Sequence, residues 1–414
     1  MNARTRTWWG WGFEDAQVLP DRAAAEAIVA QLGFGTADVE LPVPVESVRL
    51  REPRVETPEW GSTDPRDRIT HAKGRSYLDT VRAFRGRLDH PPDAVAFART
   101  EEDVERVLEW CVAEDVACIP YGGGTSVVGG VEPRVPEEYL GAVSLDLSHL
   151  DRVLEVDDVS RAARIQAGAA GPRLEQQLGE RGMTMRFFPQ SFELSTLGGW
   201  IATRAGGHFA TVWTHVDDLV ESVRAITPSG TWESRRLPGS GAGPSPDRLL
   251  LGSEGILGVI TEAWVRVQPR PEHRASRAVR FDGFLRGAEA VRALAQSGLH
   301  PSNCRLVDER EAALTGAGDG TRALLVLGFE STDHDVGALL ERGLAICREH
   351  GGEPDPPRDA AGVATWREAF LRMPYLRDTL MCCGVLSDTF ETAITWDRFP
   401  AFHEQVVGAT RAAL

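Results

Sequence analysis

A glycine-rich turn constrains this chain more than any other stretch of its 414 residues. The apolar residues 116–119 predict a short strand that ends at Pro120, and residues 122–124 are all glycine. Without β-carbons, backbone N–H groups can converge on an anion, and the hydroxyls of Thr125 and Ser126 add further donors. The pyrophosphate of a dinucleotide suits such a loop. A flexible surface loop is the alternative reading of a glycine triplet taken alone.

A second glycine-bearing stretch follows Phe188-Pro189. Ser195 and Thr196 predict the N-terminal cap of a helix whose first turn contains Gly198 and Gly199. Glycine in a helix costs roughly 1 kcal/mol of helix stability relative to alanine, and this turn contains two glycines. Either a negative or electron-rich group approaches the helix N-terminus closely, or the helix packs tightly against a neighbour. This stretch by itself leaves both readings open.

A third stretch, residues 249–260, combines glycines with an apolar run and leads into an alternating strand over 258–267. The Pro/Arg segment 269–271 then predicts a domain boundary. Beyond the boundary, short strands alternate with helices, which indicates an antiparallel sheet with helices on one face. We therefore divide the chain into an N-terminal arm (1–90) and two domains (91–271 and 272–414).

Composition limits the classes of partner. The formal net charge of −16 argues against a nucleic-acid surface, which favours basic patches. No apolar segment is long enough to cross a bilayer, and the six cysteines lack metal-ligand spacing, so we expect no metal and a reducing, cytoplasmic location. Trp8, Trp9 and Trp11 lie either in an aromatic cluster that packs the arm onto the protein or at a membrane interface.

Taken together, these stretches resemble the flavin-binding domain of the vanillyl-alcohol-oxidase type and, within that superfamily, the alkyldihydroxyacetonephosphate synthase (alkylglycerone-phosphate synthase) family. The resemblance covers nearly the whole chain, and the tryptophan arm and residues 390–398 are its more selective parts. It is carried by residues 8–12, 119–127, 193–200, 203–205, 252–263, 305–308, 390–392 and 396–398. The implied fold class is α+β, with a two-part FAD-binding domain (91–271) followed by an α+β cap, or substrate, domain with an antiparallel sheet (272–414).

The resemblance also implies which residues bind FAD. Covalent relatives often carry a histidine in the first loop, where this chain has a threonine at position 125, so we expect dissociable, non-covalent FAD. The last of the implied segments would run beside the isoalloxazine ring as an extended strand. The cofactor-binding residues implied are Pro120, Tyr121, Gly122, Gly123, Gly124, Thr125, Ser126, Gln190, Ser191, Phe192, Glu193, Leu194, Ser195, Thr196, Thr203, Arg204, Ala205, Gly206, Glu254, Gly255, Ile256, Leu257, Gly258, Val259 and Ile260.

Arg305 matches an arginine that the family needs for activity, on a strand expected to face the flavin. A fixed guanidinium there would bind a phosphate or carboxylate bidentately, and an ordinary surface arginine is the alternative. The family pattern continues past residue 398 with an arginine, a tyrosine and a run of three histidines. Because the chain stops at Leu414 without that run, we expect a C-terminal truncation or a homologue without this machinery. The isolated histidines at 208, 215, 300 and 403 are expected to be structural or solvated.

The function implied by the resemblance is exchange of the acyl chain of acyl-dihydroxyacetone phosphate for a fatty alcohol, with the flavin acting covalently through N5. The alternative is an FAD-linked dehydrogenase or oxidase of a 2-hydroxy acid such as lactate or glycolate, and a third reading is a flavoprotein without turnover. We expect a lipid-like or hydroxy-acid small molecule as substrate and no nucleic acid. Peripheral membrane contact and a homodimer stay open.

Overall fold

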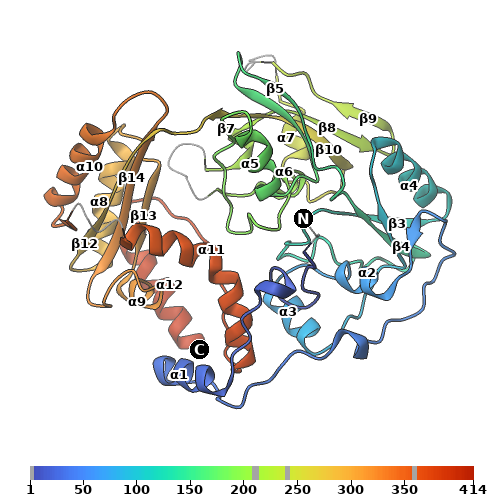
Figure 1. The fold of residues 1–414 in the computed structure, drawn as a ribbon, viewed down its shortest axis with the longest axis horizontal. Coiled ribbons are helices and arrows are strands. Elements are labelled where there is room, and N and C mark those ends of the chain that lie inside the picture. The colour runs from blue at the N-terminus through green and yellow to red at the C-terminus, as the bar shows by residue number, and fades with distance from the viewer. Residues whose placement is uncertain (1–3, 208–213, 238–242, 357–360) are drawn as a thin grey trace. The chain divides into compact units, whose positions relative to one another are not determined.

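The computed structural model describes residues 4–207, 214–237, 243–356 and 361–414, which form two compact units (Figure 1). Unit 1 contains residues 4–207, the described part of 214–270, and 371–387. Unit 2 contains residues 271–356, 361–370 and 388–414. Both units combine helices with sheets, which confirms the α+β class. The chain returns to unit 1 late in the sequence, which the linear boundaries drawn above did not anticipate.

The glycine-rich turn leaves a four-stranded sheet of unit 1 with the order β1-β2-β4-β3. Strands β2, β4 and β3 run parallel, and β1 pairs antiparallel with β2. Helix α4 (Glu101–Ala113) covers this sheet with Val104, Val107 and Cys111 in the shared core. It begins at a capping box formed by Thr100 and Asp103, as its sequence predicts. The strand bounds are β1 Gly61–Ser62, β2 Ala94–Phe97, β3 Val116–Tyr121 and β4 Gly141–Asp146.

Unit 1 also contains a five-stranded antiparallel sheet with the order β5-β6-β10-β8-β9. The second glycine-bearing stretch forms a helix next to this sheet, and the third leads into its strand β10. Helices α5 (Gly171–Gly179) and α6 (Leu197–Thr203) pack on it around Trp200 and Leu174. A turn after Thr227 joins β8 and β9 into a hairpin. The remaining bounds are β5 Val153–Asp157, β6 Ala162–Gln166, β7 Met183–Thr184, β8 Val220–Thr227, β9 Gly230–Glu233, α7 Asp247–Leu250, β10 Val259–Arg266 and β11 Gln268–Pro269.

The N-terminal arm is part of unit 1. Trp8, Trp9 and Trp11 are at most 5% exposed, so the packing reading of this cluster is confirmed and the membrane-interface reading of these side chains is wrong. Met381 and Cys382 belong to the same core cluster as the first two tryptophans. No helix in the described parts of the chain is both long and apolar enough to cross a bilayer. The arm contains α1 Arg22–Leu32, α2 Pro65–Thr70 and α3 Tyr77–Phe84, while α11 is Ala361–Cys382.

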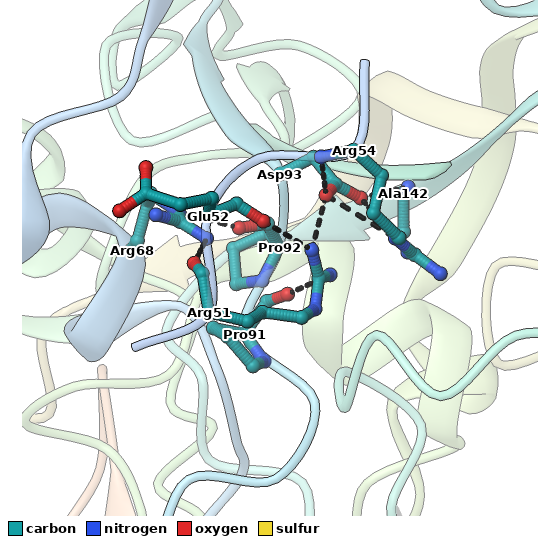
Figure 2. A network of polar contacts seen from close by, with 8 residues as sticks. All are labelled: Arg51, Glu52, Arg54, Arg68, Pro91, Pro92, Asp93 and Ala142. Atoms are coloured by element: carbon teal, nitrogen blue, oxygen red, sulfur yellow. Dashed lines mark hydrogen bonds and ion pairs between the residues drawn. The ribbon is translucent and has the colours of Figure 1, made fainter. Parts of the chain in front are cut away.

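A buried carboxylate fastens the arm to the parallel sheet (Figure 2). Asp93 is fully buried and accepts hydrogen bonds from the guanidinium groups of Arg51 and Arg54 and from the backbone N–H of Ala142 in β4. Arg68 supports the same corner by donating to the carbonyl oxygens of Arg51 and Pro92, both at 2.8 Å. Although burial of the carboxyl opposes ionisation, hydrogen bonds from Arg54 and Arg51 hold the pKa of Asp93 well below its usual range.

Unit 2 is built on an antiparallel sheet with the order β13-β14-β12-β15. Alternate residues of β14 face two different cores, because successive side chains of a strand point to opposite faces. Helices α8 and α10 cover one face, and Ala312 of α9 packs on the other, so the expectation that all helices share one face is wrong for α9. The bounds are β12 His273–Phe281, α8 Phe284–Gln296, β13 Asn303–Val307, α9 Glu309–Leu314, β14 Ala323–Ser331, α10 Gly337–Glu349, β15 Glu353–Pro354 and α12 Phe399–Ala413.

Candidate functional site

A cavity of about 340 Å³ in unit 1 brings the three glycine-bearing stretches together. Its volume lies in the range of small-molecule sites. The predicted residues that line it are Pro120, Tyr121, Gly122, Gly123, Gly124, Thr125, Ser126, Ser191, Ser195, Thr196, Thr203, Ala205, Glu254, Gly255, Gly258 and Ile260. Residues that the sequence reasoning did not select also line it, among them Gly130, Val131, Leu147, Ala167, Gly199 and Trp200. They lie in the first glycine loop, just after strand ends, or in α6.

Other predicted residues support the cavity from outside. Phe192 stacks on Trp200 at 6.3 Å between ring centroids, and Glu193 accepts a 2.5 Å hydrogen bond from Tyr375. Leu194 and Val259 are buried in the core, Arg204 pairs with Asp217, and Gly206 forms a β-bridge with His215. The remaining predicted residues, Gln190, Ile256 and Leu257, are exposed and do not line the cavity.

The glycines of the first loop are required by the protein's own packing. A β-carbon on Gly123 would lie 2.2 Å from the carbonyl oxygen of Leu194, and one on Gly122 would lie 2.4 Å from Oγ1 of Thr196. Real β-carbons do not approach atoms that closely, so only glycine lets this loop lie against residues 194–196. Gly124 has φ +63°, which favours glycine by itself. The glycines therefore bring two walls of the cavity together.

Both readings apply to Gly198, and the approach of a ligand applies to Gly199. A β-carbon on Gly198 would lie 2.8 Å from the β-carbon of Ala167, so this glycine permits close packing of α6 against the end of β6, and it also lines the cavity. Gly199 lines the cavity too, and a β-carbon there would make an ordinary 3.4 Å contact with Oγ1 of Thr196. Thr196 caps α6 by accepting a hydrogen bond from the backbone N–H of Gly199, as expected.

A buried polar pair behind the first loop was missed by sequence reasoning. Nε2 of His71 lies 2.8 Å from the carboxylate of Asp146, and the His71 ring lies 4.3 Å from that of Tyr121. Tyr121 donates a 2.9 Å hydrogen bond to the carbonyl oxygen of Thr70. Burial raises the pKa of Tyr121. Burial opposes ionisation of Asp146, but its hydrogen bond with His71 lowers the pKa of that carboxyl. The signal available in the sequence was a lone histidine before Ala72-Lys73-Gly74, which pointed only to a helix start.

The charge at the cavity surface is acidic. Among the described lining residues there is no lysine or arginine, and Glu254 contributes a carboxyl group. Glu254 adopts φ +54°, an unusual conformation for a residue other than glycine, beside Gly255 at φ +83°. Burial raises the pKa of Glu254, which favours its neutral form. Anion binding in this cavity therefore depends on backbone N–H groups and hydroxyls.

Arg305 lies in unit 2 on β13. Its strand neighbours Cys304 and Leu306 face the α8–α10 core, so Arg305 is on the side that α9 covers. Glu311 of α9 and Glu391 are the acidic groups that act on it electrostatically. Burial raises the pKa of Glu311, and the positive charge of Arg305 opposes that rise. Arg305 is thus a partly buried arginine in an acidic surrounding, which differs from the surface alternative.

The isolated histidines have ordinary surroundings where they are described. His403 stacks on Phe284 at 4.9 Å between ring centroids, and His215 takes part in the bridge to Gly206. His208 lies outside the described residues. Within the described residues, no group of three or more His, Cys, Asp or Glu side chains is arranged to hold a metal ion.

The donor set of the cavity fits FAD. The glycine loop offers backbone N–H groups, and Thr125, Ser126, Ser195 and Thr196 offer hydroxyls, which suit a pyrophosphate and ribose. Trp200, Leu147 and Ile260 add apolar surface to the same cavity. This mixture of apolar walls and a few polar groups is typical of cofactor sites.

Comparison with known proteins agrees with that chemistry. A family model described as an FAD binding domain matches residues 92–234, and one described as the C-terminal domain of FAD linked oxidases matches residues 270–413. The chain is 30% identical to the alkyldihydroxyacetonephosphate synthase of Trypanosoma brucei brucei over 80% of its own length, and 33% identical to that of Dictyostelium discoideum over 82%. It spans 57% and 59% of those two proteins.

Solved structures give the same relationship at the level of the fold. Two structures of alkyldihydroxyacetonephosphate synthase align with TM-scores of 0.81 and 0.82 at 28% and 27% identity. The alignments cover 91% and 96% of this chain, and 78% and 83% of the solved chains. The chain therefore belongs to the FAD-binding flavoenzymes of the vanillyl-alcohol-oxidase type, and it is a homologue of the alkyldihydroxyacetonephosphate synthases.

Proposed function

We propose that this protein is an alkylglycerone-phosphate synthase that replaces the acyl chain of acyl-dihydroxyacetone phosphate with a fatty alcohol. The observation that carries the proposal is the similarity to alkyldihydroxyacetonephosphate synthases, which extends over 80% of the chain or more and through both units. A D-lactate dehydrogenase from Arabidopsis thaliana matches 53% of the chain at 34% identity, and a glycolate oxidase subunit from Bacillus subtilis (strain 168) matches 72% at 26% identity. One match is shorter and the other less identical than those to the synthases, so oxidation of a 2-hydroxy acid is the weaker alternative.

In this proposal the cavity of unit 1 holds dissociable FAD. The first loop (Pro120 to Ser126) and the hydroxyls of Ser195 and Thr196 would bind its polar groups. Residues 254–260 would lie beside its ring, although they are not an extended strand as expected: residues 254–258 form a turn, and β10 begins at Val259. The other predicted residues, within 190–196, 203–206 and 254–260, would complete the site by lining the cavity or by packing against its walls. Thr125 lines the cavity, and no histidine or cysteine does so among the described residues, which supports non-covalent binding. When bound, FAD would supply the reactive isoalloxazine ring.

Arg305 is proposed as the catalytic residue of unit 2. Its guanidinium would bind and orient the phosphate of the substrate, because a planar cation with several N–H donors matches a phosphate bidentately. We expect Arg305→Met to lower turnover by about a hundredfold, roughly 2.7 kcal/mol, while the FAD content stays unchanged. Arg277→Met, on β12 of the same sheet, is the matched control and should retain activity.

The direct test combines purified protein, FAD, acyl-dihydroxyacetone phosphate and a fatty alcohol, with mass spectrometry for released fatty acid and ether product. Both products are expected, in equal amounts. Bleaching of the flavin by lactate or glycolate, with no ether product, would establish the oxidase alternative instead. FAD binding without either reaction would identify a flavoprotein that lacks turnover. The proposed location is cytoplasmic. A homodimer would appear in solution as twice the mass of one chain, and peripheral membrane contact would appear as sedimentation of the protein with lipid vesicles.

A further inference from the structure

The cavity in unit 1 poses an electrostatic problem, because FAD carries a pyrophosphate with two negative charges. No lysine or arginine lines the cavity among the described residues, and Glu254 adds a carboxyl group. Backbone N–H groups and hydroxyls offer partial charges only. Fixed cations near the loop, although not in the cavity wall, would complete the compensation, since Coulomb interactions in a low-dielectric interior act beyond contact distance.

Such cations lie directly behind the first glycine loop. Arg6 donates a 3.3 Å hydrogen bond from Nη1 to the carbonyl oxygen of Gly123. The backbone N–H of Arg75 donates a 2.7 Å hydrogen bond to the carbonyl oxygen of Ser126. Gly74 fits so closely that a β-carbon there would lie 2.2 Å from the same oxygen. Gly74, the backbone of Arg75 and the side chain of Arg6 therefore contact the loop on the side of its carbonyl groups, and Lys73 precedes Gly74 in the chain.

The positive charges of Lys73 and Arg75 are buried and only partly neutralised. The side chains of Lys73 and Arg75 are each 3% exposed. Nζ of Lys73 donates to the carbonyl oxygens of Trp9 and Gly74, at 3.2 and 3.3 Å, and the hydrogen bonds of the Arg75 side chain go to the carbonyl oxygens of Gly74 and Thr7. The buried Nε of Arg75 has no hydrogen-bond partner among the described residues.

The carboxyl groups that act electrostatically on Lys73 are Asp79 and Asp378, and both also have other partners. Asp79 is engaged in the capping box of α3, and Asp378 accepts a 2.5 Å hydrogen bond from the backbone N–H of Trp11. Burial raises the pKa of Asp378. Burial is also the main cause that lowers the pKa of Lys73, and the positive charge of Arg75 is the second cause. In both groups burial disfavours the charged form, while the positive charge of Arg75 adds to the shift at Lys73 and opposes the shift at Asp378. A bound dianion would favour the charged form of Lys73. Arg377 adds another cation, with Nη1 donating to the carbonyl oxygen of Arg75 at 2.9 Å.

We propose that Arg6, Lys73 and Arg75 form a cationic layer behind the glycine loop that attracts the pyrophosphate of FAD through the loop without touching it. The proposal rests on the placement of FAD in the unit 1 cavity. It assigns a role to the N-terminal arm, because Arg6 precedes the buried tryptophans that fasten the arm. The layer explains how a cavity with an acidic lining accepts a dianion.

The test compares two ligands that share a ring and differ in phosphate. FAD and riboflavin are titrated into apoprotein, and flavin fluorescence gives the dissociation constants. We expect Arg6→Gln and Lys73→Gln each to weaken FAD about tenfold, the effect of one unit charge near a dianion in a partly screened interior. Riboflavin affinity should change less than twofold. Arg6→Lys should restore most of the FAD affinity, and Arg22→Gln, the same charge change on exposed α1, should behave like wild type.

Apoprotein stability gives a second readout. If the layer is electrostatic, Arg6→Gln and Lys73→Gln leave the melting temperature of apoprotein unchanged or raise it, and they reduce the shift produced by FAD. A lower apoprotein melting temperature, or an equal loss of affinity for FAD and riboflavin, would show a purely structural role and overturn the proposal. Wild-type protein that binds neither ligand would instead refute the FAD site itself.

Discussion

At the scale of one residue, buried charge in this protein depends on its partners. Asp93 has no exposure, yet two guanidinium groups and two backbone N–H groups hold its carboxylate in the charged form (Figure 2). Arg51 and Arg54 remain partly exposed, so their desolvation costs less free energy than that of the carboxylate. The ion pairs of Asp93 with the two arginines therefore stabilise the contact between the arm and the four-stranded sheet.

We predict that Asp93→Asn lowers the free energy of unfolding by about 2–3 kcal/mol at pH 7, because the ionic hydrogen bonds are lost. The native-state pKa of Asp93 lies below its unfolded value, so its contribution is fully present above about pH 4 and declines as the pH falls further. Denaturant unfolding of wild type and variant between pH 7 and pH 3 measures this. A difference that stays constant down to pH 3 would contradict the assignment.

At the scale of elements, the cavity exists because a loop and a helix start approach more closely than side chains allow. Gly122 and Gly123 lie against residues 194–196, and Gly198 lies against Ala167 at the end of β6. Each contact joins segments that are far apart in the sequence. The Tyr375 hydroxyl then holds Glu193, and hence the second segment, from behind.

Gly123→Ala should weaken FAD binding by more than tenfold and destabilise the protein by about 1–3 kcal/mol, because a β-carbon there requires the loop to move away from Leu194. Gly129→Ala is the matched control: its φ of +78° costs about 1 kcal/mol, but no atom lies within 4 Å of the added β-carbon. Fluorescence titration and thermal unfolding of both variants distinguish the two effects. Equal FAD affinities for the two variants would show that the close contact does not shape the site.

At the scale of the whole molecule, the order of the chain differs from the order of its compact units. Residues 371–387 return to unit 1, where Met381 and Cys382 pack with Trp8 and Trp9. Asp378 there accepts the hydrogen bond from Trp11. The last part of α11 is thus a structural component of the unit that contains the cavity.

A fragment of residues 1–270 should therefore be less stable than the full chain, although it includes every residue that lines the cavity. Without residues 371–387, the tryptophan cluster loses part of its core, and we expect a lower melting temperature and increased binding of a hydrophobic dye. Calorimetry and dye fluorescence check this, with the fragment 1–270 supplemented by a 371–387 peptide as the comparison. A fragment that melts at the temperature of the full chain would refute the expectation.

The sequence by itself determined local structure and the identity of the cofactor. Thr100 and Asp103 start α4, Thr196 caps α6, and strands alternate with helices along unit 2 as predicted, because capping and periodicity depend on neighbouring residues. The family resemblance that the glycine-bearing stretches carry implied FAD, which the family comparisons confirm.

Only the tertiary structure decided which residues meet. Pairing of His71 with Asp146, the position of Arg6 behind Gly123, and the return of residues 371–387 join segments separated by many residues, and no local pattern encodes such contacts. The same holds for the placement of α9 on the second face of the unit 2 sheet. The first glycine loop illustrates the division: its composition predicted an anion site, while packing against Leu194 explains why a glycine is needed at position 123.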